Sequence, residues 1–214
     1  MSRGRGADRV ALGCSASLRA MRLIAAMIVG TVLAFGWGAV SWTSGLYDFA
    51  FRPMPAALAA SFPAQLASAA DRDAAYLAPP MPDTAGMSAQ QAELAQQSWL
   101  EEHRRGPLVM AIVRRHGVDP MSPTVLAKGF AIELFCTAML AAVVAIAAKF
   151  GARTQDRLAV GLVVPAFAVL ATHGVLWNFF HLPDAYALAL FVDGLVGWSL
   201  AGVACALIIR PAPR

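Results

Sequence analysis

Four long apolar stretches, separated by more polar segments, constrain the fold of this chain more than any other feature. A helix needs about 20 apolar residues to cross the hydrocarbon core of a bilayer, and each stretch reaches that length. Backbone groups in lipid must be satisfied within the segment, so isolated spans of this length are helices. The sequence therefore predicts transmembrane helices at residues 23–42, 124–148, 158–177 and 186–209.

The composition agrees with a chain whose solvent is a lipid bilayer. Hydrophobic residues make up 58% and charged residues only 14%, and the mean hydropathy is +0.59. These values are too apolar for an ordinary soluble domain of 214 residues. The net charge of +4 comes from basic residues that flank the spans and do not line one face, which argues against nucleic-acid binding.

The distribution of basic residues predicts the orientation of the chain, because Lys and Arg near the ends of spans stay cytoplasmic. The basic residues beside the spans are Arg3, Arg5, Arg9, Arg19, Arg22, Lys149, Arg153, Arg157, Arg210 and Arg214. The connection between the third and fourth spans has none. Both termini are therefore expected in the cytoplasm and residues 43–123 in the periplasm. Abundant alanine and arginine favour a GC-rich bacterial genome, and hence a bacterial inner membrane.

Residues 1–22 are interpreted as a cytoplasmic leader. The triplet that ends at Cys14 is similar to a lipoprotein cleavage box, but only four uncharged residues precede Cys14, too few for an apolar signal region. The first span is about twice as long as a cleaved signal's apolar region, which favours an uncleaved signal anchor. Met21 stands just before the span, so Met1 and Met21 are both candidate starts.

The segment 43–123 is expected to form a small α+β domain. Ser88 and Gln91 have the spacing of a capping box, and His103 to Arg105 suit the last turn of the helix that follows. Gly106 suits a left-handed cap at the end of this helix. Two apolar runs, 108–113 and the weaker 75–78, predict paired strands.

The rest of this segment is expected to be less regular. The alanine-rich residues 55–70 predict a helix interrupted at Pro63, and residues 81–87 predict a loop. The expected fold is therefore mainly α, a four-helix transmembrane bundle with a small α+β extracytoplasmic insertion between the first two helices.

Three ionisable residues within the spans, Glu133, His173 and Asp193, are the strongest candidates for a site. Each lies ten residues from Pro123 or Pro183, which places all three roughly 10 to 15 Å below the outer surface at 1.5 Å per residue. A charge facing lipid there costs at least about 2.5 to 3.5 kcal/mol, so we expect the three to converge inside the bundle. This intramembrane polar cluster either holds the helices together or handles protons, ions or a metal.

Small residues share the helix faces of the two acids and would allow close helix packing. On the second span these are Gly129, Thr137, Ala141 and Ala145, and on the fourth they are Ala189, Gly197, Ala201 and Cys205. At the membrane interface we expect Lys128 at the mouth of the second span, and Trp177, Asn178 and His181 at the last bend.

Several short motifs occur together in this chain. In order they are WGAVSW, AAYLAPP, RRGPLVMAIVR, DPMSP, WNFFHLPDAYALA and GWSLAG. In this order the motifs resemble a group of four-span bacterial inner-membrane proteins that have a periplasmic loop domain and no known activity. The resemblance implies a fold and a topology, but no catalytic residue.

Three functions remain open from the sequence. The chain contains no HExxH, CxxC or Gly-x-Ser-x-Gly motif and no phosphate-binding glycine loop, so no catalytic residue or cofactor is predicted. This absence favours a non-enzymatic accessory or assembly component that binds a membrane-protein partner or forms a homo-oligomer. The alternatives are a small oligomeric transporter or ion-coupled permeation unit that uses the buried acids, and a metal- or quinone-binding redox protein.

Overall fold

The computed structural model describes residues 4–211, and the side chains of residues 17–211. It is mainly helical and divides into two compact units. Unit 1 consists of Met1–Arg52 and Asp119–Arg214, and unit 2 of Pro53–Val118.

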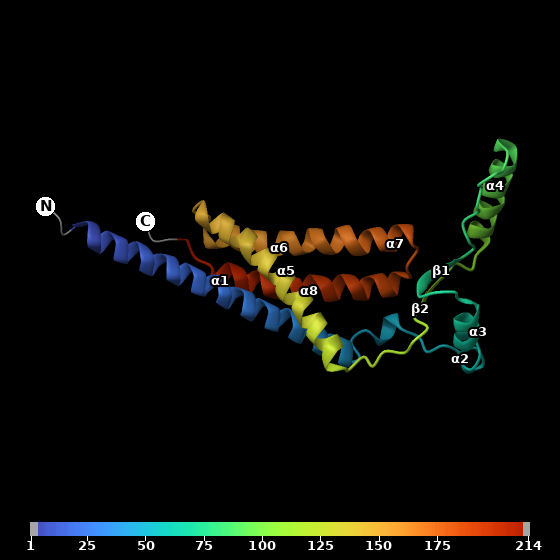
Figure 1. Ribbon diagram of the computed structural model, residues 1–214, viewed down its shortest axis with the longest axis horizontal. Helices are drawn as coiled ribbons and strands as arrows, with labels where there is room; N and C mark the ends of the chain where they lie inside the picture. The colour runs from blue at the N-terminus through green and yellow to red at the C-terminus, as the bar shows by residue number, and fades with distance from the viewer. Residues whose placement is uncertain (1–3, 212–214) are drawn as a thin grey trace. The chain divides into compact units, whose positions relative to one another are not determined.

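Unit 1 contains the four long apolar helices (Figure 1). Its elements are α1 (Gly4–Thr43), η1 (Asp48–Ala50), α5 (Pro123–Lys149), α6 (Thr154–Val169), η2 (Leu170–Gly174), α7 (Val175–Phe179) and α8 (Asp184–Ile208). The segments long and apolar enough to cross a membrane are Ser17–Thr43, Pro123–Lys149, Thr154–Phe179 and Asp184–Ile208. The prediction of four such helices is therefore confirmed, and most helices extend a few residues beyond the predicted ends. Because α1 begins at Gly4, most of the predicted leader is helix continuous with the first span.

Helix α8 packs on both α1 and α6, and α5 packs mainly on α1 (Figure 1). The antiparallel contact between α1 and α8 is built from small residues at four-residue intervals. At one end the Cys205 thiol approaches the carbonyl oxygen of Ala26, with 3.8 Å between S and O. Further along, a Cβ on Gly30 would lie 3.4 Å from the carbonyl oxygen of Ala201.

Helices α6 and α8 approach each other most closely at two glycines, Gly161 and Gly202. A Cβ added to Gly161 would lie 2.5 Å from the carbonyl oxygen of Gly202, and a Cβ on Gly202 would overlap the backbone of Gly161. Only hydrogen fits at these positions. Small residues therefore determine the spacing of both helix pairs that involve α8.

The predicted small-residue faces agree well with the observed packing. On α8, Ala189, Gly197, Ala201 and Cys205 are all buried. On α5, Thr137 and Ala141 are buried, whereas Gly129 and Ala145 are half-buried. The helix faces that carry the two candidate acids are thus those turned toward the bundle.

The position and burial of Arg157 differ from what the sequence predicts. It was expected between the second and third spans, but α6 begins at Thr154 and the Arg157 side chain is only 3% exposed. Its Nε donates to the carbonyl oxygen of Ala206 at 3.1 Å, Nη1 to that of Ala152 at 2.7 Å, and Nη2 to Oγ1 of Thr154 at 3.2 Å. Arg157 therefore ties the start of α6 to the last turns of α8, where the helix dipole favours a cation.

Unit 2 contains short helices and one two-stranded antiparallel sheet. Its elements are α2 (Ala56–Ala59), α3 (Phe62–Ala69), β1 (Ala74–Ala78), α4 (Ala89–Arg105) and β2 (Val109–Val113). The predicted strands and their pairing are confirmed, with Leu77 opposite Met110. The predicted interruption near Pro63 also occurs, but the break lies before Phe62 and Pro63 stands in the first turn of α3, where its missing N–H costs nothing.

Helix α4 has the capping box that the sequence predicts. The backbone N–H of Ser88 donates to Oε1 of Gln91 at 3.0 Å, and the Ser88 hydroxyl accepts from the backbone of Gln91. The helix ends at Gly106, whose φ of 63° and ψ of −174° differ from the predicted left-handed helical cap. This extended conformation at positive φ is open almost only to glycine.

Candidate functional site

Asp193 is a well-connected acidic side chain within the membrane-spanning part of unit 1. It lies on α8 and accepts hydrogen bonds from three side chains near the end of α1. Ser41 Oγ donates to Oδ1 at 2.7 Å, Tyr47 Oη donates to Oδ1 at 3.2 Å, and Trp42 Nε1 donates to Oδ2 at 2.9 Å. We call these four residues the Asp193 site.

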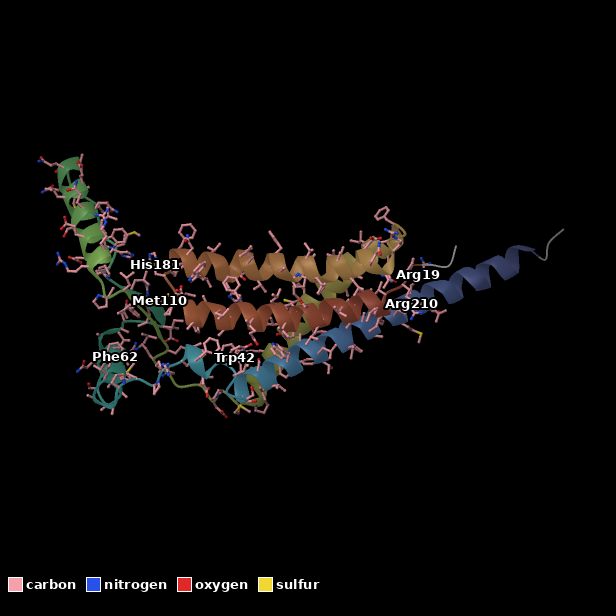
Figure 2. The ribbon with its side chains drawn as sticks, turned by 180° about the vertical axis from the view of Figure 1, so that it is seen from behind. Arg19, Trp42, Phe62, Met110, His181 and Arg210 are labelled. Carbon is pink, nitrogen blue, oxygen red and sulfur yellow. The ribbon has the colours of Figure 1, made fainter. Side chains whose placement is uncertain are left out.

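Local structure at the end of α1 brings the three donors together. Ser41 and Trp42 lie in the last turn of α1, and Gly45, at a φ of 79°, turns the chain back so that Tyr47 returns toward α8. The rings of Trp42 and Tyr47 then pack with 5.0 Å between their centroids. Figure 2 labels Trp42 at this end of the helix.

At the Asp193 site, one carboxylate is fixed in place by three hydrogen-bond donors. All three partners are neutral donors, and hydrogen bonds to an ionised acceptor are about twice as strong as neutral ones. Ser41 is buried and Tyr47 is only 4% exposed. Burial, and next the negative charge of Asp193, raise the pKa of the Tyr47 phenol. Tyr47 therefore stays protonated and available as a donor at neutral pH.

Glu133 lies half-buried on α5 and has no such set of partners. Its Oε2 atom is buried and has no hydrogen-bond partner among the described residues. Glu133 therefore lacks the hydrogen-bond donors that surround Asp193.

His173 lies in η2, a π-helical turn between α6 and α7. Such turns insert one extra residue into a helix and are frequent at functional sites. The imidazole packs on Phe191 of α8 with 6.3 Å between ring centroids, and its Nε2 lies 3.7 Å from where a Cβ on Gly194 would stand. Its Nδ1 atom is buried and has no hydrogen-bond partner among the described residues. His173 thus lies beside Gly194, the residue next to Asp193.

No hydrogen bond joins Glu133, His173 and Asp193 to one another among the side chains of residues 17–211. In the same part of the chain, no group of three His, Cys, Asp or Glu side chains could hold a metal ion. The carboxylate of Asp193 uses its hydrogen-bonding capacity on Ser41, Trp42 and Tyr47 instead.

The four residues predicted at the membrane interface lie on α5, on α7 and in the turn between α7 and α8. Trp177 Nε1 donates to Oδ1 of Asp184, the first residue of α8, at 2.9 Å and so links α7 to α8. His181 is exposed in the turn between them and has a φ of 52°. Asn178 on α7 and Lys128 on α5 are exposed.

Sequence reasoning missed the donors of the Asp193 site. The sequence indicates Trp42 and Tyr47 only as aromatic residues at the outer membrane interface, and it does not single out Ser41. One signal was present, a cluster of side chains with N–H or O–H donors in residues 41–47, at the end of the first span that is expected on the same side of the membrane as Asp193.

Comparisons of the chain with protein-family models, with curated proteins and with solved structures find no match. The resemblance to four-span bacterial inner-membrane proteins therefore stays a prediction.

Proposed function

We propose that this chain is a non-enzymatic accessory or assembly component of a membrane complex, and that unit 2 binds its protein partner. In this proposal both termini lie in the cytoplasm of a bacterium, the four long helices cross the inner membrane, and residues 43–123 form a periplasmic α+β insertion. The pattern of basic residues supports this orientation.

The observation that carries the proposal is the apolar, exposed face of the β1–β2 hairpin. In the pairing register, Ala75 is opposite Ile112 and Leu77 is opposite Met110, so these side chains share one face of the sheet. The exposed fractions are 53% for Leu77, 37% for Met110 and 78% for Ile112. A two-stranded hairpin is marginally stable unless one face packs on something else, and an exposed apolar patch often marks a protein interface.

The Asp193 site supports a structural role for the membrane part. A carboxylate on the first half of α8 that accepts hydrogen bonds from three neutral donors near the end of α1 stabilises a fixed helix pair. A stable anchor for a partner-binding unit needs such a fixed pair.

Site-specific photocrosslinking in native membranes tests the proposal. A photoreactive amino acid at Ile112 should give one discrete adduct with a different membrane or periplasmic protein, identified by mass spectrometry. The same amino acid at Gln96, an exposed polar position on α4 of the same unit, is the matched control. Leu77→Thr should weaken the adduct at Ile112 while the chain remains in the membrane. An unmodified monomer, or an adduct only with a second copy of this chain, contradicts a partner-binding role.

A second candidate function is ion-coupled permeation. The observation in its favour is that Glu133 and His173 each keep a buried polar atom without a hydrogen-bond partner among the described residues, and intramembrane ionisable groups often mark pathways. Proton or cation flux through liposomes that contain the purified chain, abolished by Glu133→Gln, would support it. Impermeable liposomes would leave the accessory role as the better proposal.

A further inference from the structure

A pocket lined by four cationic side chains lies where α1, α5 and α8 meet, at the end of the bundle opposite the Asp193 site. Its volume is about 310 Å³. Arg19 and Arg22 come from α1, Lys149 is the last residue of α5, and Arg210 follows the end of α8. Figure 2 shows Arg19 and Arg210 near each other at this end. Among the side chains of residues 17–211, no acidic one lines the pocket.

The floor of the pocket is apolar and part of the packed core. Leu23, Ala148 and Ile209 line it, and all three belong to the hydrophobic cluster formed by α1, α5 and α8. The pocket is therefore built by the same contacts that hold the helices together. Its position depends on the fold of unit 1 and, for Arg210, on the segment that directly follows α8.

Membrane topology explains the sign of these charges but not their convergence. Basic residues on the cytoplasmic side need only flank the spans, whereas these four come from α1, from the end of α5 and from the segment just after α8, and line one pocket. The C-terminal ends of α5 and α8 offset part of the mutual repulsion, because their carbonyl groups carry partial negative charge. Among the described side chains, no carboxylate forms an ion pair with Arg22, Lys149 or Arg210. An anion from outside the chain would supply a countercharge to these three side chains.

We propose that this pocket binds the phosphate group of an anionic ligand. The guanidinium groups offer paired N–H donors to phosphate oxygens, and Lys149 adds a point charge. Two sources could supply the phosphate: an anionic phospholipid headgroup or a soluble phosphate. The apolar floor and the position at the end of membrane helices favour the lipid, whose acyl chains would lie along the helices. This inference is independent of the partner-binding role proposed for unit 2.

Native mass spectrometry of the full chain in mild detergent tests the proposal. Phosphatidylglycerol should bind more tightly than phosphatidylcholine with the same acyl chains. The double variant Lys149→Gln/Arg210→Gln should bind phosphatidylglycerol about 25-fold more weakly, at about fivefold for each cation removed. Lys149→Arg/Arg210→Lys should retain binding, because it keeps both charges.

The matched control is Arg104→Gln/Lys128→Gln, which removes two charges away from the pocket and should not change lipid binding. The unfolding temperature of each variant, followed by tryptophan fluorescence, separates loss of binding from loss of fold. Titration with inorganic phosphate in the absence of lipid distinguishes the two sources. Binding of phosphate as tight as that of phosphatidylglycerol would support a soluble ligand in the same pocket. Equal binding of the two lipids, or a pocket variant that binds like the control, would overturn the proposal.

Discussion

Ser41 on α1 donates a 2.7 Å hydrogen bond to Asp193 on α8, across 152 positions of sequence. This contact stands at one end of the row of small residues along which α1 and α8 pack, and the contact between Ala26 and Cys205 stands near the other. Close packing of small residues sets the distance between the helices. The buried hydrogen bond sets their register, because a shifted helix would leave the carboxylate without its donors.

Two substitutions of Asp193 should separate the effect of its charge on stability from the effect of its hydrogen bonds. Asp193→Ala removes all acceptors and leaves the donors Ser41, Trp42 and Tyr47 without their partner, which should cost about 2 to 4 kcal/mol of stability. In Asp193→Asn the amide oxygen can accept from Trp42, and the amide N–H groups can donate to the hydroxyl groups of Ser41 and Tyr47. The loss of stability should therefore stay below about 1.5 kcal/mol. Thermal unfolding in detergent measures both, and equal losses would contradict a hydrogen-bonding role.

The Tyr47 phenol should make the bundle sensitive to alkaline pH. Burial and the charge of Asp193 raise the pKa of Tyr47 in the folded chain above its ordinary value of about 10. The contribution of the neutral phenol is therefore complete below pH about 10 and is lost as the pH rises through the folded value. Unfolding temperatures between about pH 8 and pH 11 should fall less in Tyr47→Phe than in the natural chain. Ser41→Ala, which removes a donor that does not titrate, should keep the full alkaline loss.

The glycine contact between α6 and α8 should not tolerate a methyl group. Gly202→Ala places a Cβ against the backbone of Gly161, so the helices must separate, at a cost of at least about 2 kcal/mol. Gly36→Ala on α1 is the control, since no atom lies within 4 Å of its added Cβ. It should be neutral or stabilising, because alanine has the higher helix propensity. Similar unfolding temperatures for the two variants would rule out tight packing at Gly202.

Gly106 should be required for the turn between α4 and β2. Its φ of 63° strains any residue with a Cβ, so Gly106→Ala should cost more than about 1 kcal/mol. Gly117→Ala, at a position with open space and no positive φ, should have little effect. Amide hydrogen exchange of β2 in the full chain reports the local change. Unchanged protection of β2 in Gly106→Ala would show that the turn does not depend on glycine.

Reporter fusions should reveal the proposed orientation. Fusions after Lys149 and after Arg214 should be active only with a cytoplasmic reporter, and a fusion at Ala85 only with a periplasmic one. The expectation follows from the absence of Lys and Arg between α7 and α8 and their presence on the opposite side. A periplasmic C-terminus would contradict four membrane crossings.

Much of the local structure could be predicted because it depends on neighbouring residues. The length and hydropathy of four stretches predict four helices, since a helix satisfies its own backbone in lipid. Ser88 and Gln91 predict the start of α4, because the capping box involves only residues three apart. The strand nature of β2 follows from a short apolar run between turn signals.

The π-helical turn at His173 and the burial of Arg157 could not be predicted in the same way. A π turn has no strong local signal, and here it accompanies the packing of His173 on Phe191. Arg157 resembles any basic residue beside a span until the end of α8 supplies its carbonyl partner. Both features depend on a helix that lies far away in the sequence.

The sequence by itself determined which segments are helical, where α4 and β2 lie, and that Asp193 and Glu133 stand on faces of small residues. Each of these properties depends on contacts within a few positions of the chain. Only the tertiary structure decided that Asp193 binds Ser41, Trp42 and Tyr47, that Gly161 meets Gly202, and that four cations surround one pocket. The physical reason is that the rotation and spacing of packed helices depend on the summed fit of all their side chains, which no local pattern contains.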